Sequence, residues 1–542
     1  MNKIYSFAIP FLLFFTGSFA QMLPADTSWT KCLGGSGTET PGTAMSSNFG
    51  MNAAYVAVDS SGNFYTATCT NSSNGYVNGN SGLNDIWLLK ISPQGDTLWT
   101  RRFGGSGDER VYRVRSVSSG GIIMLGKTQS NDGDFTGSHG QTDAFIIRVS
   151  ADGNTLFNKL YGGADQDYLY DIAENPDGNF VACGETGSND GDLTAAGSGL
   201  GWVLFINGNS GTVSSSVTFE GPDHASANFL ENLFTITRLA DGTGYIAAGY
   251  TSPDFSNSNA DNIWVLKFNF AATVIWSKKY GSITSSDYPS AVLDAGDGQF
   301  YIVASTSAAG GNNTSGYFGG PSDGWLIKCD ETGNILWNKN YGGTNWDAFY
   351  DGAVQSSGNI LLSGFTRSSD NDLSTTTPRG LADYWLVQVS GNNGSIIDMK
   401  RAGGSAGDFG IGMAYDSLRN NILMVGRTES TDGCVHGNNG GRDLWIVCYS
   451  SDEQLSLDQL PENNFNIIAY PNPVNNLLTI SSSQPVERIE LFNSEGIHVK
   501  GVICLPGKEG NYHIETEKLS KGYYLLNVIT QNGNKTIKLI KD

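Results

Sequence analysis

The residues of this sequence best suited to chemistry are aspartates in two identical five-residue loops. The segment SNDGD occurs at 130–134 and again at 188–192, so Asp132 and Asp134 have counterparts in Asp190 and Asp192. Ca²⁺ takes six to eight oxygen ligands, and these four carboxylates are the first candidates for such a site. The spacing does not match an EF-hand loop, and Asp and Asn also hydrogen-bond within their own turns. The sequence therefore leaves two interpretations, a calcium site and a pair of Asx turns.

Motifs for other chemistry fail in their context. Residues 121–128, GIIMLGKT, match the P-loop pattern, but the central residues form a predicted strand and no helix follows. Residues 403–407, GGSAG, match a nucleophile elbow, yet they occupy a turn that recurs along the chain. Five histidines show no metal-ligand spacing. The sequence thus predicts no catalytic residue and, calcium aside, no cofactor.

An apolar run that recurs seven times organises residues 28–450. Each copy begins at an aromatic residue, and the copies are 57 to 62 residues apart: Trp87, Phe145, Trp202, Trp264, Trp325, Trp385 and Trp445. The first six copies are followed by a Gly-containing turn and a second strand, and two further strands complete each unit. Four short strands in about 60 residues are typical of a propeller blade. We therefore predict an all-β chain with a seven-bladed β-propeller at 21–450, which resembles repeat propellers of exported bacterial proteins.

The two ends of the repeat region complement each other. The first strand, at 28–33, has no unit of its own, and the seventh unit lacks its outer strand, so the first strand is expected to close the ring against 443–450. The hairpin register of the other units places Trp29 opposite Cys448, which argues against a disulfide between Cys32 and Cys448. The recurring aromatic residues are expected to pack in the core.

Loop parity places most of the acidic residues on one face. In a four-stranded antiparallel blade, the loop between blades and the loop between the second and third strands open at the same end. The SNDGD loops belong to that end. Since the formal net charge is −21, this face should repel phosphate backbones, and nucleic acid is excluded as a partner.

Residues 1–20 have the pattern of a signal peptide. Lys3 precedes the apolar run FAIPFLLFF, and Ser18-Phe19-Ala20 is a small-residue cleavage site. No later stretch approaches the ~20 apolar residues of a transmembrane helix, so none is expected. The mature protein is predicted to be exported.

The composition changes after an acidic linker at 451–464. The segments IIAYPNPVNNLLTI, LFNSEG and KGYYLLNVIT, with a terminal KLIKD, follow in order. Residues 465–542 thereby resemble the type A C-terminal sorting domain of type IX secretion cargo. The resemblance covers Tyr470, Pro471, Asn472, Pro473 and Gly522. It implies a small immunoglobulin-like β-sandwich, recognition by the outer-membrane translocon, and a protein that is secreted or held at the outer cell surface.

These signals favour a binding or adhesion propeller displayed outside the cell, with a glycan or a protein as ligand. The alternative is a propeller hydrolase or lyase acting on polysaccharide, because carboxylates are numerous enough to supply an acid/base pair. A structural surface protein without a small ligand is a third hypothesis.

Overall fold

The computed structural model describes residues 27–39, 55–77, 79–193, 200–222, 231–251, 262–281 and 286–450, and then 467–482, 485–493, 499, 504–506, 511–530 and 533–541. The predicted signal peptide and linker lie outside these ranges. The chain divides into two compact units, Met1–Ser451 and Asp452–Asp542, which are described separately.

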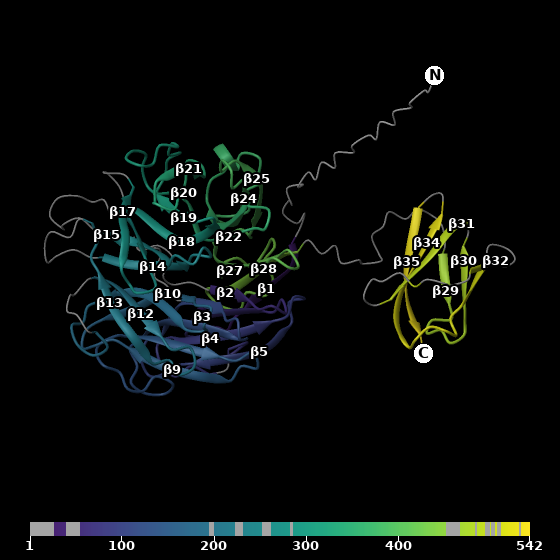
Figure 1. The fold of residues 1–542 in the computed structure, drawn as a ribbon, viewed down its shortest axis with the longest axis horizontal. Helices are drawn as coiled ribbons and strands as arrows, with labels where there is room; N and C mark the ends of the chain where they lie inside the picture. The colour runs from purple at the N-terminus through teal and green to yellow at the C-terminus, as the bar shows by residue number, and fades with distance from the viewer. Residues whose placement is uncertain are drawn as a thin grey trace, which may run out of the picture. The chain divides into compact units, whose positions relative to one another are not determined.

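In the described part of the first unit, the strands form seven four-stranded antiparallel sheets (Figure 1). Six sheets consist of four consecutive strands, and the seventh joins the last three strands to the first. The innermost strands are β2 (Tyr55–Val58), β6 (Arg110–Ser116), β10 (Asp167–Glu174), β14 (Glu231–Arg238), β18 (Asp287–Gly296), β22 (Asp347–Val354) and β26 (Asp408–Asp416).

The next strands outward are β3 (Phe64–Thr70), β7 (Ile122–Thr128), β11 (Phe180–Thr186), β15 (Tyr245–Thr251), β19 (Gln299–Thr306), β23 (Ile360–Thr366) and β27 (Asn421–Thr428). The third strands are β4 (Asp85–Ile91), β8 (Asp143–Val149), β12 (Leu200–Ile206), β16 (Asn262–Phe268), β20 (Asp323–Cys329), β24 (Asp383–Val389) and β28 (Asp443–Ser450). The outer strands are β5 (Thr97–Phe103), β9 (Thr155–Tyr161), β13 (Val213–Phe219), β17 (Val274–Tyr280), β21 (Ile335–Tyr341), β25 (Ile396–Ala402) and β1 (Thr27–Leu33).

The innermost strands make a closed ring. Each of them contacts the innermost strand of the next sheet, from β2 through β6, β10, β14, β18 and β22 to β26, and β26 contacts β2. A ring of radially arranged sheets is the architecture of a β-propeller. Among the described residues the only helix is a 3₁₀ turn, η1 (Asn371–Leu373), and none is long and apolar enough to cross a membrane.

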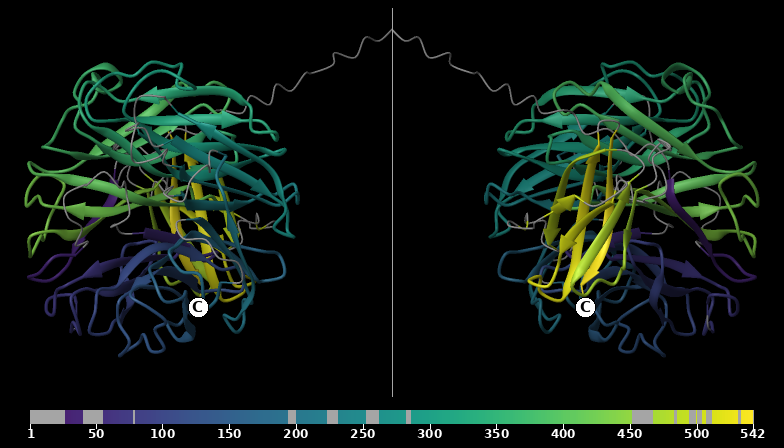
Figure 2. Two further views of the ribbon diagram at one scale, coloured as in Figure 1. Left: turned by 90° about the vertical axis from the view of Figure 1, so that its left-hand side faces the viewer. Right: turned by 90° about the vertical axis from the view of Figure 1, so that its right-hand side faces the viewer.

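Strand β1 completes the last sheet by pairing with β28, and Figure 2 shows the purple N-terminal strand beside the green strands of that sheet. Trp29 lies opposite Cys448 and Cys32 opposite Trp445, so the two cysteines are not cross-strand neighbours. Both are free thiols. Because the strand hydrogen bonds of the first segment satisfy the edge of the last sheet, the ring has no open end at this joint.

The core of the first unit lies between the sheets. The third strand of most sheets is buried on both faces, as expected for a strand that packs between two neighbouring sheets. The aromatic residue that begins each repeated run is buried in all seven copies, including Phe145 and Trp445. The repeated aromatic position is therefore a packing position.

The second unit consists of two antiparallel sheets around one core. One sheet has the order β29 (Ile467–Tyr470), β30 (Leu477–Ser482), β33 (Asn511–Glu515) and β32 (Cys504–Pro506). The other has the order β31 (Val486–Asn493), β34 (Gly522–Thr530) and β35 (Gly533–Lys541). Side chains from both sheets, among them Ile480, Ile514 and Leu526, form a single buried cluster. This unit thus has a hydrophobic core of its own.

Candidate functional site

The SNDGD loops pack against the turn that enters the same sheet from the preceding one. Asp132 accepts a hydrogen bond from the Ser106 amide at 2.7 Å, and Asp134 accepts one from the Gly104 amide at 2.9 Å. The second loop repeats this arrangement. Asp190 accepts from Ala164 N at 2.8 Å, and Asp192 accepts from Gly162 N at 3.1 Å.

These hydrogen bonds join two different loops, whereas an Asx turn would close within one loop. The structure therefore gives the four aspartates a role in holding neighbouring loops together. Among the described residues, no three His, Cys, Asp or Glu side chains gather into a metal-binding group. Calcium binding at Asp132, Asp134, Asp190 or Asp192 stays a prediction.

The glycine inside the first SNDGD loop is required by close backbone approach. Gly133 has a φ of +62°, and a Cβ at this position would lie 2.3 Å from the carbonyl oxygen of Gly104. Only glycine tolerates both conditions without a shift of the turn. The loop can reach the preceding turn for this reason.

A second acidic set is buried where one sheet passes to the next. Glu109 is completely buried and accepts hydrogen bonds from Thr128 Oγ1 at 2.8 Å, Ser130 Oγ at 2.7 Å and Gly105 N at 3.0 Å. Buried carboxylates occupy the equivalent position in other sheets: Glu39, Asp167, Asp347 and Asp408. They are structural clamps, since hydroxyl and amide donors surround them.

In several sheets, the clamp carboxylate faces a second buried carboxylate, which belongs to the first residue of the third strand. In four of these residues one oxygen, Oδ1, is buried without a hydrogen-bond partner in the described structure: Asp85, Asp323, Asp383 and Asp443. Asp383 is compensated by Arg401, whose Nη2 lies 2.6 Å from Oδ2. Burial raises the pKa of Asp323 to about 8; the amide of Phe318, a donor at 2.6 Å, opposes this shift and the nearby Asp347 adds to it.

Asp323 should therefore make stability depend on pH. Because its folded pKa lies above the ordinary value of 3.8, its contribution is complete below about pH 4 and is lost as the pH rises through about 8. We expect Asp323→Asn to raise the free energy of unfolding by about 1–3 kcal/mol at pH 9 and to change it little at pH 4. The chain itself carries Asn262 at the corresponding position of the fourth repeat.

The measurement is urea unfolding of both proteins at the two pH values. Asp383→Asn is the matched control, because it removes a carboxylate that Arg401 compensates, and it should lower stability at pH 9. If the two substitutions changed the free energy of unfolding equally at pH 9, the raised pKa assigned to Asp323 would be contradicted.

The axis of the ring is occupied by a buried arginine. Arg113 of β6 lies 3.4 Å from Asp171 Oδ1 on β10 and 3.7 Å from Asp351 Oδ2 on β22, with its guanidinium 5.1 Å from the centre of the Tyr55 ring. Its Nη2 also donates to the carbonyl oxygen of Ser290 on β18 at 3.4 Å. One side chain thus connects five innermost strands.

A β-bulge in each of the three innermost strands that carry these charged residues sets the direction of their side chains. The pairing register shifts between Val111 and Arg113, between Leu169 and Asp171, and between Phe349 and Asp351. A bulge inserts one residue and so changes which side chains point to a given face. The three charged residues follow the bulge directly and meet at the axis.

The network fixes the charge state of its members. Burial opposes ionisation of Asp171, but Arg113 and Arg115 outweigh it and lower the pKa of Asp171. Burial likewise disfavours the charged form of Arg113, while Asp171 and Asp351 raise the pKa of Arg113 above its usual value. Asp171 and Arg113 are therefore both ionised at neutral pH.

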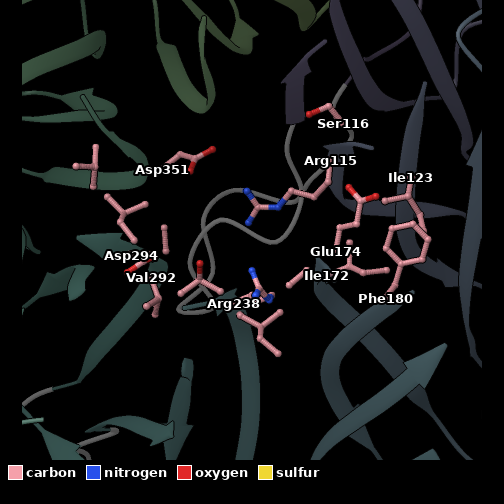
Figure 3. A pocket seen from close by; sticks show the side chains of 16 residues that line it. Arg115, Ser116, Ile123, Ile172, Glu174, Phe180, Arg238, Val292, Asp294 and Asp351 are labelled. Carbon is pink, nitrogen blue, oxygen red and sulfur yellow. The ribbon is translucent and has the colours of Figure 1, made fainter. Parts of the chain in front are cut away.

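Next to this network lies a cavity of about 460 Å³ (Figure 3). It is lined by residues of β6, β10, β14, β18 and β22, so it lies on the axis of the ring. Its charged groups are those of Arg115, Glu174, Arg238, Asp294 and Asp351, and Ile172, Ile236 and Val292 are among its apolar residues. A concave site with apolar walls and a few convergent polar groups is the usual form of a ligand pocket.

The carboxylates in this cavity are already engaged by donors of the protein. Glu174 accepts from Ser118 N at 2.8 Å and from Ser118 Oγ at 2.5 Å. Asp294 accepts from Ala240 N at 2.8 Å and Gly296 N at 3.1 Å. These bonds hold the carboxylates in place, whereas a general acid/base pair has to exchange protons with a substrate.

The repeat pattern does not single out the axial residues. Arg113 and Arg115 lie on β6, which in the sequence is one of the further strands of its repeat unit. The one sign in the sequence that could have identified these arginines is that charged residues stand in a strand that is expected to be buried. Loop parity predicts that most of the acidic residues share one side of the sheets, but it does not reveal that the clamp carboxylates are buried.

In the second unit, four of the residues that resemble a sorting signal, Tyr470 to Pro473, lie at the end of β29 and directly after it, and the fifth, Gly522, lies in the other sheet. Asn472 donates from Nδ2 to the Lys538 carbonyl at 2.7 Å and accepts from the Ile540 amide at 2.8 Å, which fixes it to β35. The peptide bonds before Pro471 and Pro473 are cis. Tyr470 is exposed, and Gly522 begins β34 with a φ of +150°. Their part in sorting stays a prediction.

The first unit defines a β-propeller with an axial cavity, followed by a small two-sheet unit. Comparison with known families identifies the second unit: the family described as the secretion system C-terminal sorting domain matches residues 468–542. The chain is therefore a type IX secretion cargo with a β-propeller in its N-terminal part, exported to the cell surface or secreted.

The other similarities to known proteins are low. The regulatory protein FlaEY of Caulobacter vibrioides is 28% identical over 116 residues, which cover 20% of this chain and only 12% of that protein. The Neurospora crassa Pan2 WD40 domain has a TM-score of 0.45 at 8% identity, covering 80% of this chain and 98% of that domain. The Dos1 propeller has a TM-score of 0.40 at 10% identity, covering 78% and 94%. The propeller assignment rests on the closed ring of strands.

Proposed function

We propose that this protein is an exported binding protein whose seven-bladed propeller holds a ligand in the axial cavity. The cavity carries the proposal: five innermost strands contribute to it, and charged and apolar groups converge in it. The sorting domain delivers the propeller to the outside of the cell, where the ligand is a glycan or a protein.

The ring of innermost strands supports seven blades, since seven sheets contact one another in sequence and the last contacts the first. The two sheets of the second unit around one core support an immunoglobulin-like sandwich. We infer that the translocon recognises this sandwich.

The test is an array of glycans and peptides probed with the full-length secreted protein and with a cavity-filling variant, Thr237→Trp. Thr237 lines the cavity and is half-buried, so a bulky side chain there should occupy the ligand space. We expect the full-length protein to bind at least one array ligand, and the binding signal of that ligand to fall at least about tenfold with Thr237→Trp. Absence of any ligand, or binding that Thr237→Trp leaves unchanged, would contradict the proposal. Hydrolysis of an array glycan would establish an enzyme instead.

A further inference from the structure

We propose that the axial cavity recognises the carboxylate group of its ligand through Arg238, with Arg115 as a second positive group. This inference rests on the proposed ligand-binding function and names the chemistry of that site. Figure 3 shows both arginines among the side chains that line the cavity.

Arg238 has no ion-pair partner among the described residues. Its Nε is buried there without a hydrogen-bond partner, and its guanidinium lies 5.8 Å from the centre of the Phe270 ring. An unpaired donor of a charged group costs free energy when it loses water, unless a partner replaces that water. A ligand with acceptor oxygens would supply the missing partner.

Arg115 adds positive charge on the neighbouring wall of the cavity. It uses Nε and Nη2 to bind Asp171, at 2.8 to 3.1 Å, and its side chain remains 41% exposed. Asp171 is completely buried beneath it, so the carboxylate does not compete for the exposed part of the guanidinium. Arg115 can therefore attract a ligand while remaining fixed in position.

The acceptor is a monoanion because the cavity also contains carboxylates. Glu174, Asp294 and Asp351 line it, and each accepts hydrogen bonds from the protein. A dianionic phosphate would meet stronger repulsion from these groups than a carboxylate. A planar carboxylate also matches the fork of a guanidinium, which binds it through two parallel hydrogen bonds. The apolar walls, such as Ile236 and Val292, would pack against the rest of the ligand.

The net charge of −21 does not oppose this assignment strongly. Charges farther away than about 8 Å are screened at physiological salt, and the interaction inside the cavity is screened much less. Affinity should consequently fall only moderately as salt increases.

Two pairs of probes test the inference by isothermal titration calorimetry on the full-length protein. D-glucuronate and its amide represent a sugar acid, and N-acetyl-leucine and its amide represent a peptide C-terminus. We expect one of the acids to bind, its amide to bind at least about tenfold more weakly, and Arg238→Gln to weaken the acid by a similar factor. The acid that binds identifies whether the carboxylate comes from a sugar or a peptide.

Two further variants make the result specific. Arg101→Gln removes one positive charge from an exposed position on β5, outside the cavity, and should leave affinity within about twofold. Arg238→Lys keeps the charge but loses the fork, and should retain part of the affinity. Far-ultraviolet circular dichroism of each variant verifies that it is folded.

The outcomes separate this inference from the proposed function. Suppose that an array ligand has no carboxylate, that Thr237→Trp blocks its binding and that Arg238→Gln does not. This result would overturn the carboxylate inference and leave the proposed binding function standing. Failure of both acids to bind, equal binding of acid and amide, or binding of inorganic phosphate in preference to both acids would also overturn the inference. The array result alone decides the function.

Discussion

Arg113→Met is expected to lower the free energy of unfolding of the propeller by about 3–5 kcal/mol. The Arg113 side chain is 7% exposed and the Asp171 side chain is 0% exposed, so the ion pair between them is shielded from water. Without Arg113, Asp171 keeps Arg115 as its one ion-pair partner among the described residues, and Asp351 loses the ion pair that the described structure gives it. Two largely buried carboxylates thus lose charge compensation. Among the described residues, Asp351, which is 11% exposed, would keep the amides of Gly352 and Met413 as donors, at 2.9 and 3.2 Å.

The matched control for this prediction lies two residues along the same strand. Arg115 binds the same Asp171, but its side chain is 41% exposed, so Arg115→Met should cost about 1 kcal/mol or less. The double variant Arg113→Met/Asp351→Leu should recover part of the loss, because it removes the orphaned carboxylate together with its cation. Urea unfolding at pH 7 measures all three. If Arg113→Met lowered the free energy of unfolding by less than Arg115→Met does, the axial role of Arg113 would be contradicted.

The repeat could be predicted because its signal is local. Apolar runs such as the one from Trp87 have a fixed length and recur at nearly constant spacing, and each needs a neighbouring sheet to cover its two faces. The pairing of β1 with β28 follows from counting strands in the first and last units. These inferences require no knowledge of side-chain direction.

The cavity could not be predicted because its residues meet only in three dimensions. Arg115 and Arg238 are separated by two sheets' worth of sequence, and they share a space only because the ring closes. Their direction depends on the bulges after Val111 and Leu233, and a bulge reverses the faces of all residues that follow it. Bulges have no clear sequence signature in these strands.

The SNDGD loops illustrate a different limit. Composition indicated oxygen ligands for a cation, and the same oxygens serve as acceptors for backbone amides such as that of Ser106. The two uses require the same residue types, so the sequence could not distinguish them. Loop packing across sheets, which the repeat implies but does not specify, determines which donors are near.

Deletion of residues 468–542 is expected to abolish export of the protein across the outer membrane. The deleted segment is the part that matches the sorting domain, and it has a core separate from that of the propeller. The propeller should consequently fold in the truncated protein and accumulate in the periplasm. Immunoblots of medium, cell surface and periplasm, with the full-length protein alongside, measure the distribution.

The complementary experiment attaches residues 452–542 to a periplasmic reporter, which should then reach the outside of the cell. Asn472→Ala in this fusion tests the geometry of the sorting segment. The Asn472 side chain makes two hydrogen bonds with the backbone of β35, one to the Lys538 carbonyl and one from the Ile540 amide. If the loss of these two bonds displaces the Pro-flanked segment, the translocon should export the variant less efficiently than the parent fusion. A truncated propeller found outside the cell in full amount would instead show that the information for export lies within residues 1–467.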